Sequence, residues 1–236
     1  MNDNKTAIVT GGNRGIGKAI ALRLAKENYN LIIYGRDEEA LKKTQSEIKK
    51  LGVECKYFSG DAADENFVKE SVAEIEKGFG KIDLLVNNAG MGIFKKLVDS
   101  ELRDFKTQID VNLYGIYNFS KAVLGGMIKH KSGAIINIAS LAGKNSFPGG
   151  TMYSASKHAV LGFTRSLMLE VREYNIRVAA ICPGSVATEF FGGTGRHPNY
   201  DKILKADDVA ESVMAILKLP VHALISEVDL RPTNPK

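Results

Sequence analysis

The sequence contains no tryptophan and, among its 236 residues, only two cysteines and six prolines. Cys55 and Cys182 lie far apart and neither belongs to a Cys-x-x-Cys pair, so a disulfide scaffold and a zinc ribbon are excluded. No apolar run approaches the ~20 residues that a membrane-spanning helix needs. The first residues also lack the apolar core and cleavage site of a signal peptide. We therefore expect a cytoplasmic protein with reduced thiols and no membrane partner.

Charge of one sign is also scarce, because 32 basic residues face 27 acidic ones and the net charge is +5. The signs alternate within predicted helices, as in residues 37–43, and no basic stripe with interleaved aromatic residues is present. Nucleic-acid binding is therefore not expected. We also expect no metal site, because none of the four histidines shows ligand spacing. These are His130, His158, His197 and His222.

Short apolar runs rich in β-branched residues alternate with segments of helical period along the whole chain. This alternation predicts βαβ units and a parallel sheet. Apolar residues at helical spacing, such as Ile16, Ile20 and Leu24, would cover the faces of that sheet. We expect one domain over residues 1–236, of Rossmann-type α/β fold, with a doubly wound parallel seven-stranded sheet and helices on both faces. The strands are expected at about residues 6–10, 30–34, 53–58, 82–86, 133–139, 176–182 and 224–230.

One irregular, glycine-rich stretch, residues 184–205, follows the sixth predicted strand directly. Ligands of open α/β sheets bind outside the carboxyl ends of the strands. We therefore predict that this stretch is a mobile substrate lid.

The first predicted strand ends in Thr10-Gly-Gly-Asn-Arg-Gly-Ile-Gly17 and passes directly into a helix. Glycines allow the backbone to approach a pyrophosphate, and the free N–H groups and dipole of the helix favour an anion. The spacing is Gly-x-x-x-Gly-x-Gly, however, and not the strict Gly-x-Gly-x-x-Gly fingerprint. A glycine-rich turn without a ligand is the alternative, but the strand before it and the helix after it favour a nucleotide.

The end of the second strand indicates which nucleotide is bound. An acidic side chain there would hold the ribose 2′-hydroxyl of NAD, but the sequence places Arg36 at this point. Arg36, together with Arg14 of the glycine loop, offers guanidinium groups suited to a 2′-phosphate, which favours NADP(H). The alternative is that both are surface arginines at helix starts, with Asp37 capping the next helix.

The pattern Tyr-x-x-x-Lys occurs twice, at Tyr117–Lys121 and Tyr153–Lys157. On a helix the two side chains share a face, where an ammonium can lower the pKa of a phenol towards neutrality. Such a phenol can donate a proton to a carbonyl group or remove one from an alcohol. Ser140, which stands 13 residues before Tyr153 at the end of a strand, favours the second pair as the active one.

With these motifs in this order, the sequence resembles the short-chain dehydrogenase/reductase family over essentially its full length. Jointly the motifs are highly specific, although none is so alone. They are Thr10–Gly17, Asp61, Asn87-Asn88-Ala89-Gly90, Asn112, Ser140, Tyr153-x-x-x-Lys157 and Pro183-Gly184-x-x-x-Thr188.

The resemblance implies catalytic roles for four residues. Tyr153 would be the general acid in reduction, and Ser140 would polarise the substrate oxygen. Lys157 would lower the pKa of Tyr153 and bind the nicotinamide ribose. Asn112 would hold a water that relays protons from Lys157; the alternative is a polar residue inside a bent helix.

The resemblance also implies a set of cofactor contacts. Asp61 would meet the adenine edge, Asn88 would contact the cofactor through its backbone, and Thr188 would bind the nicotinamide carboxamide. From the residues alone, Asp61 and Thr188 are expected to cap neighbouring turns, and Asn87 to bridge strands. The full set is Gly11, Asn13, Arg14, Gly15, Ile16, Gly17, Arg36, Asp61, Ala62, Asn88, Ala89, Gly90, Tyr153, Lys157, Pro183, Gly184, Val186 and Thr188.

The expected function is NADPH-dependent reduction of a ketone or aldehyde carbonyl, either in a 3-oxoacyl thioester or in a small molecule. Phe190, Phe191 and the few charges of residues 184–205 suggest a small or apolar substrate. The carboxyl-terminal tail lacks the glycine-rich stretch usual in ketoacyl reductases, and this difference makes a thioester substrate less favoured. The basic turn Lys129–Lys131 would either meet an acidic carrier protein or neutralise a helix terminus, and the second is favoured.

Two further expectations follow from the resemblance. We expect a homotetramer or homodimer that associates through helices at residues 101–130 and 153–174. The alternative to the enzyme is a catalytically idle NADP-binding sensor, which the complete set of four catalytic residues disfavours.

Overall fold

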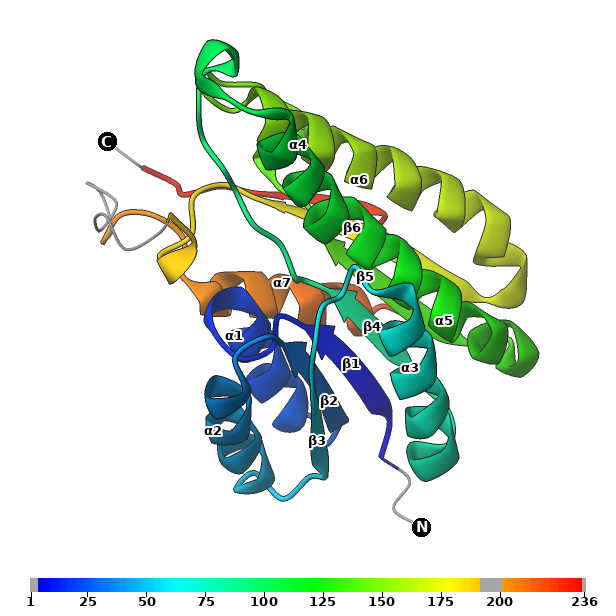
Figure 1. The fold of residues 1–236 in the computed structure, drawn as a ribbon. Helices are drawn as coiled ribbons and strands as arrows, with labels where there is room; N and C mark the ends of the chain where they lie inside the picture. The colour runs from blue at the N-terminus through cyan, green and yellow to red at the C-terminus, as the bar shows by residue number, and fades with distance from the viewer. Residues whose placement is uncertain (1–3, 192–200, 235–236) are drawn as a thin grey trace.

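Seven strands form one parallel sheet in the computed structural model, which describes residues 4–191 and 201–234 (Figure 1). Their order is β3-β2-β1-β4-β5-β6-β7, so the chain winds outward in both directions from β1 and β4. This order confirms the predicted doubly wound Rossmann-type sheet. The strands are β1 (Thr6–Thr10), β2 (Asn30–Gly35), β3 (Cys55–Ser59), β4 (Leu84–Asn87), β5 (Gly133–Ile138), β6 (Ile176–Pro183) and β7 (Glu227–Leu230).

Helices cover both faces of the sheet, as predicted (Figure 1). One face carries α1 (Gly15–Ala25), α2 (Glu38–Lys49) and α7 (Ala206–Leu217). The other carries α3 (Glu65–Phe79), α5 (Gly115–His130) and α6 (Thr151–Val171). A short helix, α4 (Leu102–Ile109), leads into α5 through a π-helical turn at Asp110–Tyr114.

The central strand β1 is buried at every position, because helices pack on both sides of it. Ala7 and Val9 pack in the cluster under α1, α2 and α7, whereas Ile8 packs in the cluster under α3, α5 and α6. The predicted apolar stripe of α1 is confirmed at Ile20 and Leu24, which are both fully buried.

Three strands begin later than predicted. The third begins at Cys55 instead of Val53, which is buried in the core before the strand ladder. The fourth begins at Leu84, although the apolar run starts at Ile82, because Ile82 is buried in the core and lies before the strand ladder. The seventh begins at Glu227, three residues after Leu224, which is partly exposed. In all three places an apolar residue lies just before the ladder, and sequence periodicity does not distinguish such a residue from the start of a strand.

The predicted lid at residues 184–205 is described only in part, because residues 192–200 lie outside the described residues. Its two ends are joined by a parallel bridge between Val186 and Leu204. The Ala187 N–H donates to the Leu204 carbonyl at 2.7 Å, and a 3-10 turn follows at Glu189–Phe191. Among the described helices, none is both long and apolar enough to cross a membrane.

Candidate active site

A cleft of about 990 Å³ opens at the carboxyl ends of the central strands, where the winding direction reverses. All but two of the predicted site residues line this cleft. The exceptions are Gly17 and Asn112, which are both buried and do not line the cleft.

The glycine loop between β1 and α1 is shaped for a close backbone approach. Gly11 and Gly15 have φ values of +64° and +52°, which L side chains rarely adopt. A Cβ on Gly17 would lie 2.2 Å from the Gly11 carbonyl oxygen, so no larger residue fits there. Arg14, the N-cap of α1, makes no side-chain cap hydrogen bond. The loop therefore offers a glycine cradle and a helix terminus that fit a pyrophosphate.

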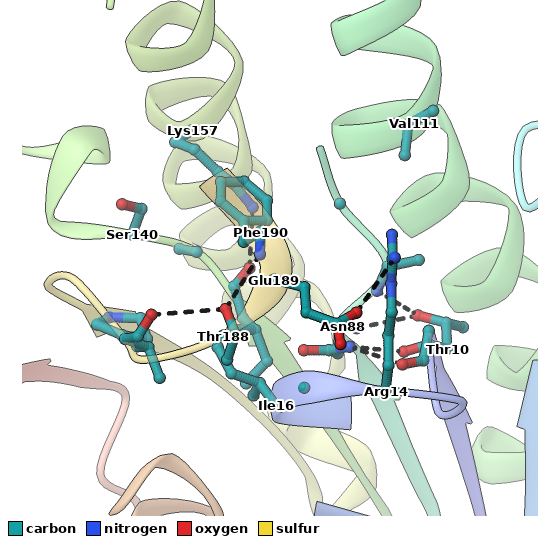
Figure 2. Close-up of a pocket in the computed structure, with 18 of the residues that line it drawn as sticks. Thr10, Arg14, Ile16, Asn88, Val111, Ser140, Lys157, Thr188, Glu189 and Phe190 are labelled. Carbon is teal, nitrogen blue, oxygen red and sulfur yellow. Dashed lines mark hydrogen bonds and ion pairs between the residues drawn. The ribbon is translucent and has the colours of Figure 1, made fainter. Parts of the chain in front are cut away.

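Asn88 and Thr10 hold this loop against the end of β4 (Figure 2). The Asn88 Nδ2 atom donates to the Thr10 carbonyl at 3.0 Å. Thr10 Oγ1 accepts the backbone N–H groups of Asn88 and Ala89, each at 2.9 Å. The Asn88 side chain is thus part of the scaffold of the site.

Both arginines proposed for the 2′-phosphate line the cleft. Arg36 is exposed directly after β2, and Asp37 caps α2 by accepting the Ala40 N–H at 3.0 Å. Arg14 forms an ion pair with Glu189 at 3.6 Å, which links the glycine loop to the lid (Figure 2). No motif in the sequence predicts this pair, because the partners are distant in the chain.

Asp61 and Thr188 both make the local contacts expected from the residues alone. Asp61 Oδ1 accepts the Ala63 N–H at 2.9 Å, and Thr188 Oγ1 accepts the Phe190 N–H at 3.4 Å. Both side chains also line the cleft, so a ligand there would meet residues that are already held in place.

Tyr153 and Ser140 meet at the end of β5. Tyr153 lies in the first turn of α6 and is 8% exposed, and Ser140 follows β5 by two residues. Burial raises the pKa of Tyr153, and a hydrogen bond with Ser140 opposes that rise. Ser140 Oγ also accepts the Ala142 N–H at 3.1 Å, which fixes its position at the start of a 3-10 turn.

Lys157 lies one helical turn after Tyr153 and is buried. Its Nζ atom donates to the Ile138 carbonyl at 3.1 Å and lies 5.9 Å from the centroid of the Tyr153 ring. Burial lowers the pKa of Lys157 to about 8. The net shift of the Tyr153 pKa is therefore upward and not downward as expected, because burial of the phenol dominates.

Asn112 lies in the π-helical turn and is fully buried. Its Oδ1 atom accepts the Met91 N–H at 2.8 Å, while Nδ2 donates to the Met91 carbonyl at 2.9 Å and to Ser156 Oγ at 3.0 Å. A Cβ on Gly90 would lie 3.3 Å from Asn112 Oδ1 and 3.5 Å from Lys157 Nζ. The Asn112 side chain therefore anchors the loop after β4, beside Lys157.

The other Tyr-x-x-x-Lys pair lies outside the cleft. Tyr117 and Lys121 are exposed on α5, with Nζ 5.3 Å from the ring centroid. The prediction that Tyr117–Lys121 is surface is confirmed. Asn87 also has the predicted structural role, because its Nδ2 atom donates to Asn137 Oδ1 across β4 and β5 at 2.9 Å.

Two cleft residues had no signal in the motifs. Phe94 and Phe147 line the cleft from separate loops, together with Phe190 of the lid. The Phe94 ring centroid lies 5.2 Å from that of Tyr153 and 5.9 Å from that of Phe147. The one available signal was that each is a large apolar residue in a loop, where exposure often marks binding.

Comparison with known proteins identifies the family. The sequence model described as short chain dehydrogenase matches residues 5–199. A 3-oxoacyl-[acyl-carrier-protein] reductase of Chlamydia muridarum is 40% identical over 191 residues, covering 80% of this chain and 77% of the relative.

Solved structures agree with this match. An alcohol dehydrogenase from Thermococcus sibiricus, complexed with 5-hydroxy-NADP, has a TM-score of 0.90 at 33% identity, covering 98% of this chain and 97% of the other. An NAD⁺-bound xylitol dehydrogenase has a TM-score of 0.88 at 28% identity, covering 98% and 100%. The fold, the glycine loop and these matches show that the chain belongs to the short-chain dehydrogenase family of NAD(P)-dependent oxidoreductases.

Proposed function

We propose that this protein reduces a ketone or aldehyde carbonyl to an alcohol with NADPH, and that Tyr153 donates the proton. The observation that carries the proposal is the meeting of Tyr153, Ser140 and Lys157 in the cleft that also contains the glycine loop. A nicotinamide cofactor held by this loop would supply the hydride in the cleft where Tyr153 supplies the proton.

The residues of the cleft fit NADP(H). The cradle at Gly11 and Gly17 and the start of α1 suit its pyrophosphate, and Arg36 and Arg14 suit a 2′-phosphate. The nicotinamide supplies the hydride when bound. We assign the predicted contacts of Asp61, Asn88 and Thr188 to the same ligand. The NADP preference rests on the arginines, because the two solved relatives described above carry an NADP derivative and NAD⁺ respectively.

The proton movements follow from the surroundings of each group. Because burial raises the pKa of Tyr153, its phenol is protonated at neutral pH and can donate to the substrate oxygen. Ser140 Oγ is placed to hydrogen-bond the same oxygen. The Lys157 ammonium stabilises the phenolate that remains and returns a proton to it. We place the relay water at the backbone of Asn112, because both side-chain polar atoms are bonded to Met91 and Ser156.

The substrate class that we favour is a small carbonyl compound. The relative from Chlamydia muridarum is named for a 3-oxoacyl carrier-protein substrate, so the thioester is the second candidate. In this chain the basic turn lies at the carboxyl end of α5, where Lys131 is the C-cap and cations are stabilised by the helix dipole. That position explains the turn without a carrier protein.

NADPH oxidation against acetoacetyl thioesters, diketones, quinones and aromatic aldehydes tests the proposal. Tyr153→Phe should lower kcat by about 10²- to 10⁴-fold and leave NADPH affinity unchanged. Tyr117→Phe is the matched control, because Tyr117 belongs to the second Tyr-x-x-x-Lys pair and lies outside the cleft. Undiminished turnover by Tyr153→Phe would contradict the assignment, and tight NADPH binding without any turnover would favour a sensor.

A further inference from the structure

We propose that the substrate end of the cleft binds an aromatic ring attached to the reacting carbonyl, so that the substrates are uncharged aryl aldehydes and aryl ketones. This inference rests on the proposed function and names its substrate class. It is carried by three phenyl rings that line the cleft together with Tyr153, two of which contact the Tyr153 ring.

The rings come from three separate segments. Phe94 lies in the loop after β4, Phe147 in the loop before α6, and Phe190 in the 3-10 turn of the lid. The centroid of Tyr153 lies 5.2 Å from that of Phe94 and 6.0 Å from that of Phe190, with interplanar angles of 70° and 57°. These are the distances and tilts of favourable aromatic pairs.

Each phenyl ring is also partly exposed. Phe94, Phe147 and Phe190 are 38%, 42% and 37% exposed, and all three line the cleft. Large apolar side chains that are exposed together in a concave site indicate a ligand. Because the rings are tilted against one another, they offer both edges and faces to a further ring.

Two glycines seat the rings. A Cβ on Gly92 would lie 2.5 Å from Phe94 Cζ, and a Cβ on Gly150 would lie 2.5 Å from Phe147 Cζ. Both phenyl groups therefore pack directly on glycine backbone, where any other residue would displace them. The wall is thus positioned by the local sequence.

The loop that carries Phe94 is also held from behind. Gln108, which is fully buried in α4, accepts the Ile93 N–H at 3.0 Å through Oε1. One helical turn later Asn112 bonds both backbone groups of Met91. Gln108 and Asn112 thus fix the backbone on both sides of Gly92 and set the position of Phe94 over Tyr153.

The charged groups beside the rings are paired. Lys95, next to Phe94, forms an ion pair with Asp104 at 2.8 Å, and Glu189, next to Phe190, pairs with Arg14. An anionic substituent would have to compete with these carboxylates for its cation. An uncharged aryl group needs no such exchange and gains ring contacts that a saturated group lacks.

Two matched diketones test the inference through turnover: 1-phenyl-1,2-propanedione and 1-cyclohexyl-1,2-propanedione. Wild-type protein should show a several-fold higher kcat/KM for the phenyl compound. Phe94→Leu should bring the ratio close to one, mainly by raising KM for the phenyl compound. Phe105→Leu is the control, because Phe105 is similarly exposed but lies on α4 outside the cleft. Unchanged NADPH affinity and circular dichroism establish that each variant is folded.

Binding without chemistry separates this inference from the proposed function. Benzamide and cyclohexanecarboxamide are compared by ligand-observed NMR in the presence of NADP⁺. The aromatic site is supported if the wild-type protein binds benzamide selectively and Phe94→Leu abolishes this binding. This conclusion holds even if neither diketone is reduced, and in that case only the proposed function fails. Equal binding of both amides, or a preference that survives Phe94→Leu, overturns the aromatic site, even if both diketones are reduced.

Discussion

Lys157 and Arg36 both line the cleft, but Lys157 is buried and Arg36 is exposed. Lys157 is enclosed between α6 and the end of β5, where burial lowers the pKa of its ammonium. Arg36 is exposed directly after β2 and lines the cleft, so its guanidinium group is accessible to a ligand. We therefore expect Lys157 to respond to pH and Arg36 to bind a phosphate group of the ligand.

The buried Lys157 predicts a pH dependence of stability. Its pKa falls from 10.5 to about 8 in the folded protein. Between these values the unfolded chain binds a proton that the folded protein has released, so the free energy of unfolding should rise with pH. The contribution is at most about 1.4 kcal/mol per pH unit. Urea denaturation from pH 7.5 to 9.5 measures it.

The controls for this measurement are two lysine variants. Lys157→Met should lack the rise, whereas Lys121→Met, on the surface of α5, should retain it. The same slope in wild type and Lys157→Met would show that Lys157 does not titrate in this range.

Arg36→Ala should weaken NADPH binding while leaving NADH binding nearly unchanged. A lost charge-assisted hydrogen bond costs about 1.5–3 kcal/mol, which corresponds to roughly 10- to 100-fold in Kd. Arg36 gives a cleaner test than Arg14, whose removal would also release Glu189. Fluorescence titration of both cofactors measures the effect, with Arg103→Ala on α4 as the control. Equal losses for the two cofactors would refute the 2′-phosphate role.

Two buried amide side chains show how elements position the cleft loops. Gln108 of α4 accepts the Ile93 N–H beside Phe94. Asn118 of α5 donates to the carbonyls of Ala62 and Ala63 at 3.1 Å, on the loop after β3. Two helices, α4 and α5, thus hold two of the loops that line the cleft.

Gln108→Met and Asn118→Leu should therefore have different kinetic effects. Gln108→Met leaves the buried Ile93 N–H without its acceptor, which should cost about 1–3 kcal/mol of stability. We expect KM for the carbonyl substrate to rise while KM for NADPH stays constant. Asn118→Leu should raise KM for NADPH instead. Steady-state kinetics with each substrate varied in turn measures both, and equal changes in both KM values for either variant would contradict the prediction.

Large apolar side chains are exposed just before α4 and at its first residue. Val98, Leu102 and Leu97 are 86%, 67% and 64% exposed. Contiguous apolar surface of this kind marks association. We therefore expect α4 and α5 to contribute to a homodimer or homotetramer, together with α6.

Leu102→Glu should shift the assembly towards smaller species at micromolar concentration, because it places a charge in the apolar contact. Sedimentation velocity measures this shift. Val221→Glu is the control, since Val221 is equally apolar and exposed but lies between α7 and β7. A wild-type monomer at micromolar concentration would exclude the expected assembly.

Residue patterns along the chain are sufficient to predict the doubly wound sheet, the glycine loop and the choice between the two Tyr-x-x-x-Lys pairs. These features depend on neighbours along the chain, such as Ser140 at a strand end, and local spacing records them. The cofactor contacts and the catalytic roles were predicted from the motifs and remain to be tested.

The surroundings of these residues depend on how the chain folds. The folded chain places Phe94 against Tyr153 and Phe147 against Phe94, pairs Arg14 with Glu189, and binds the Asn112 side chain to Met91. It also reversed the expected pKa shift of Tyr153, because the shift depends on burial by the whole site. Contacts between distant segments and exclusion of water arise only when the chain is folded, so sequence spacing carries no record of them.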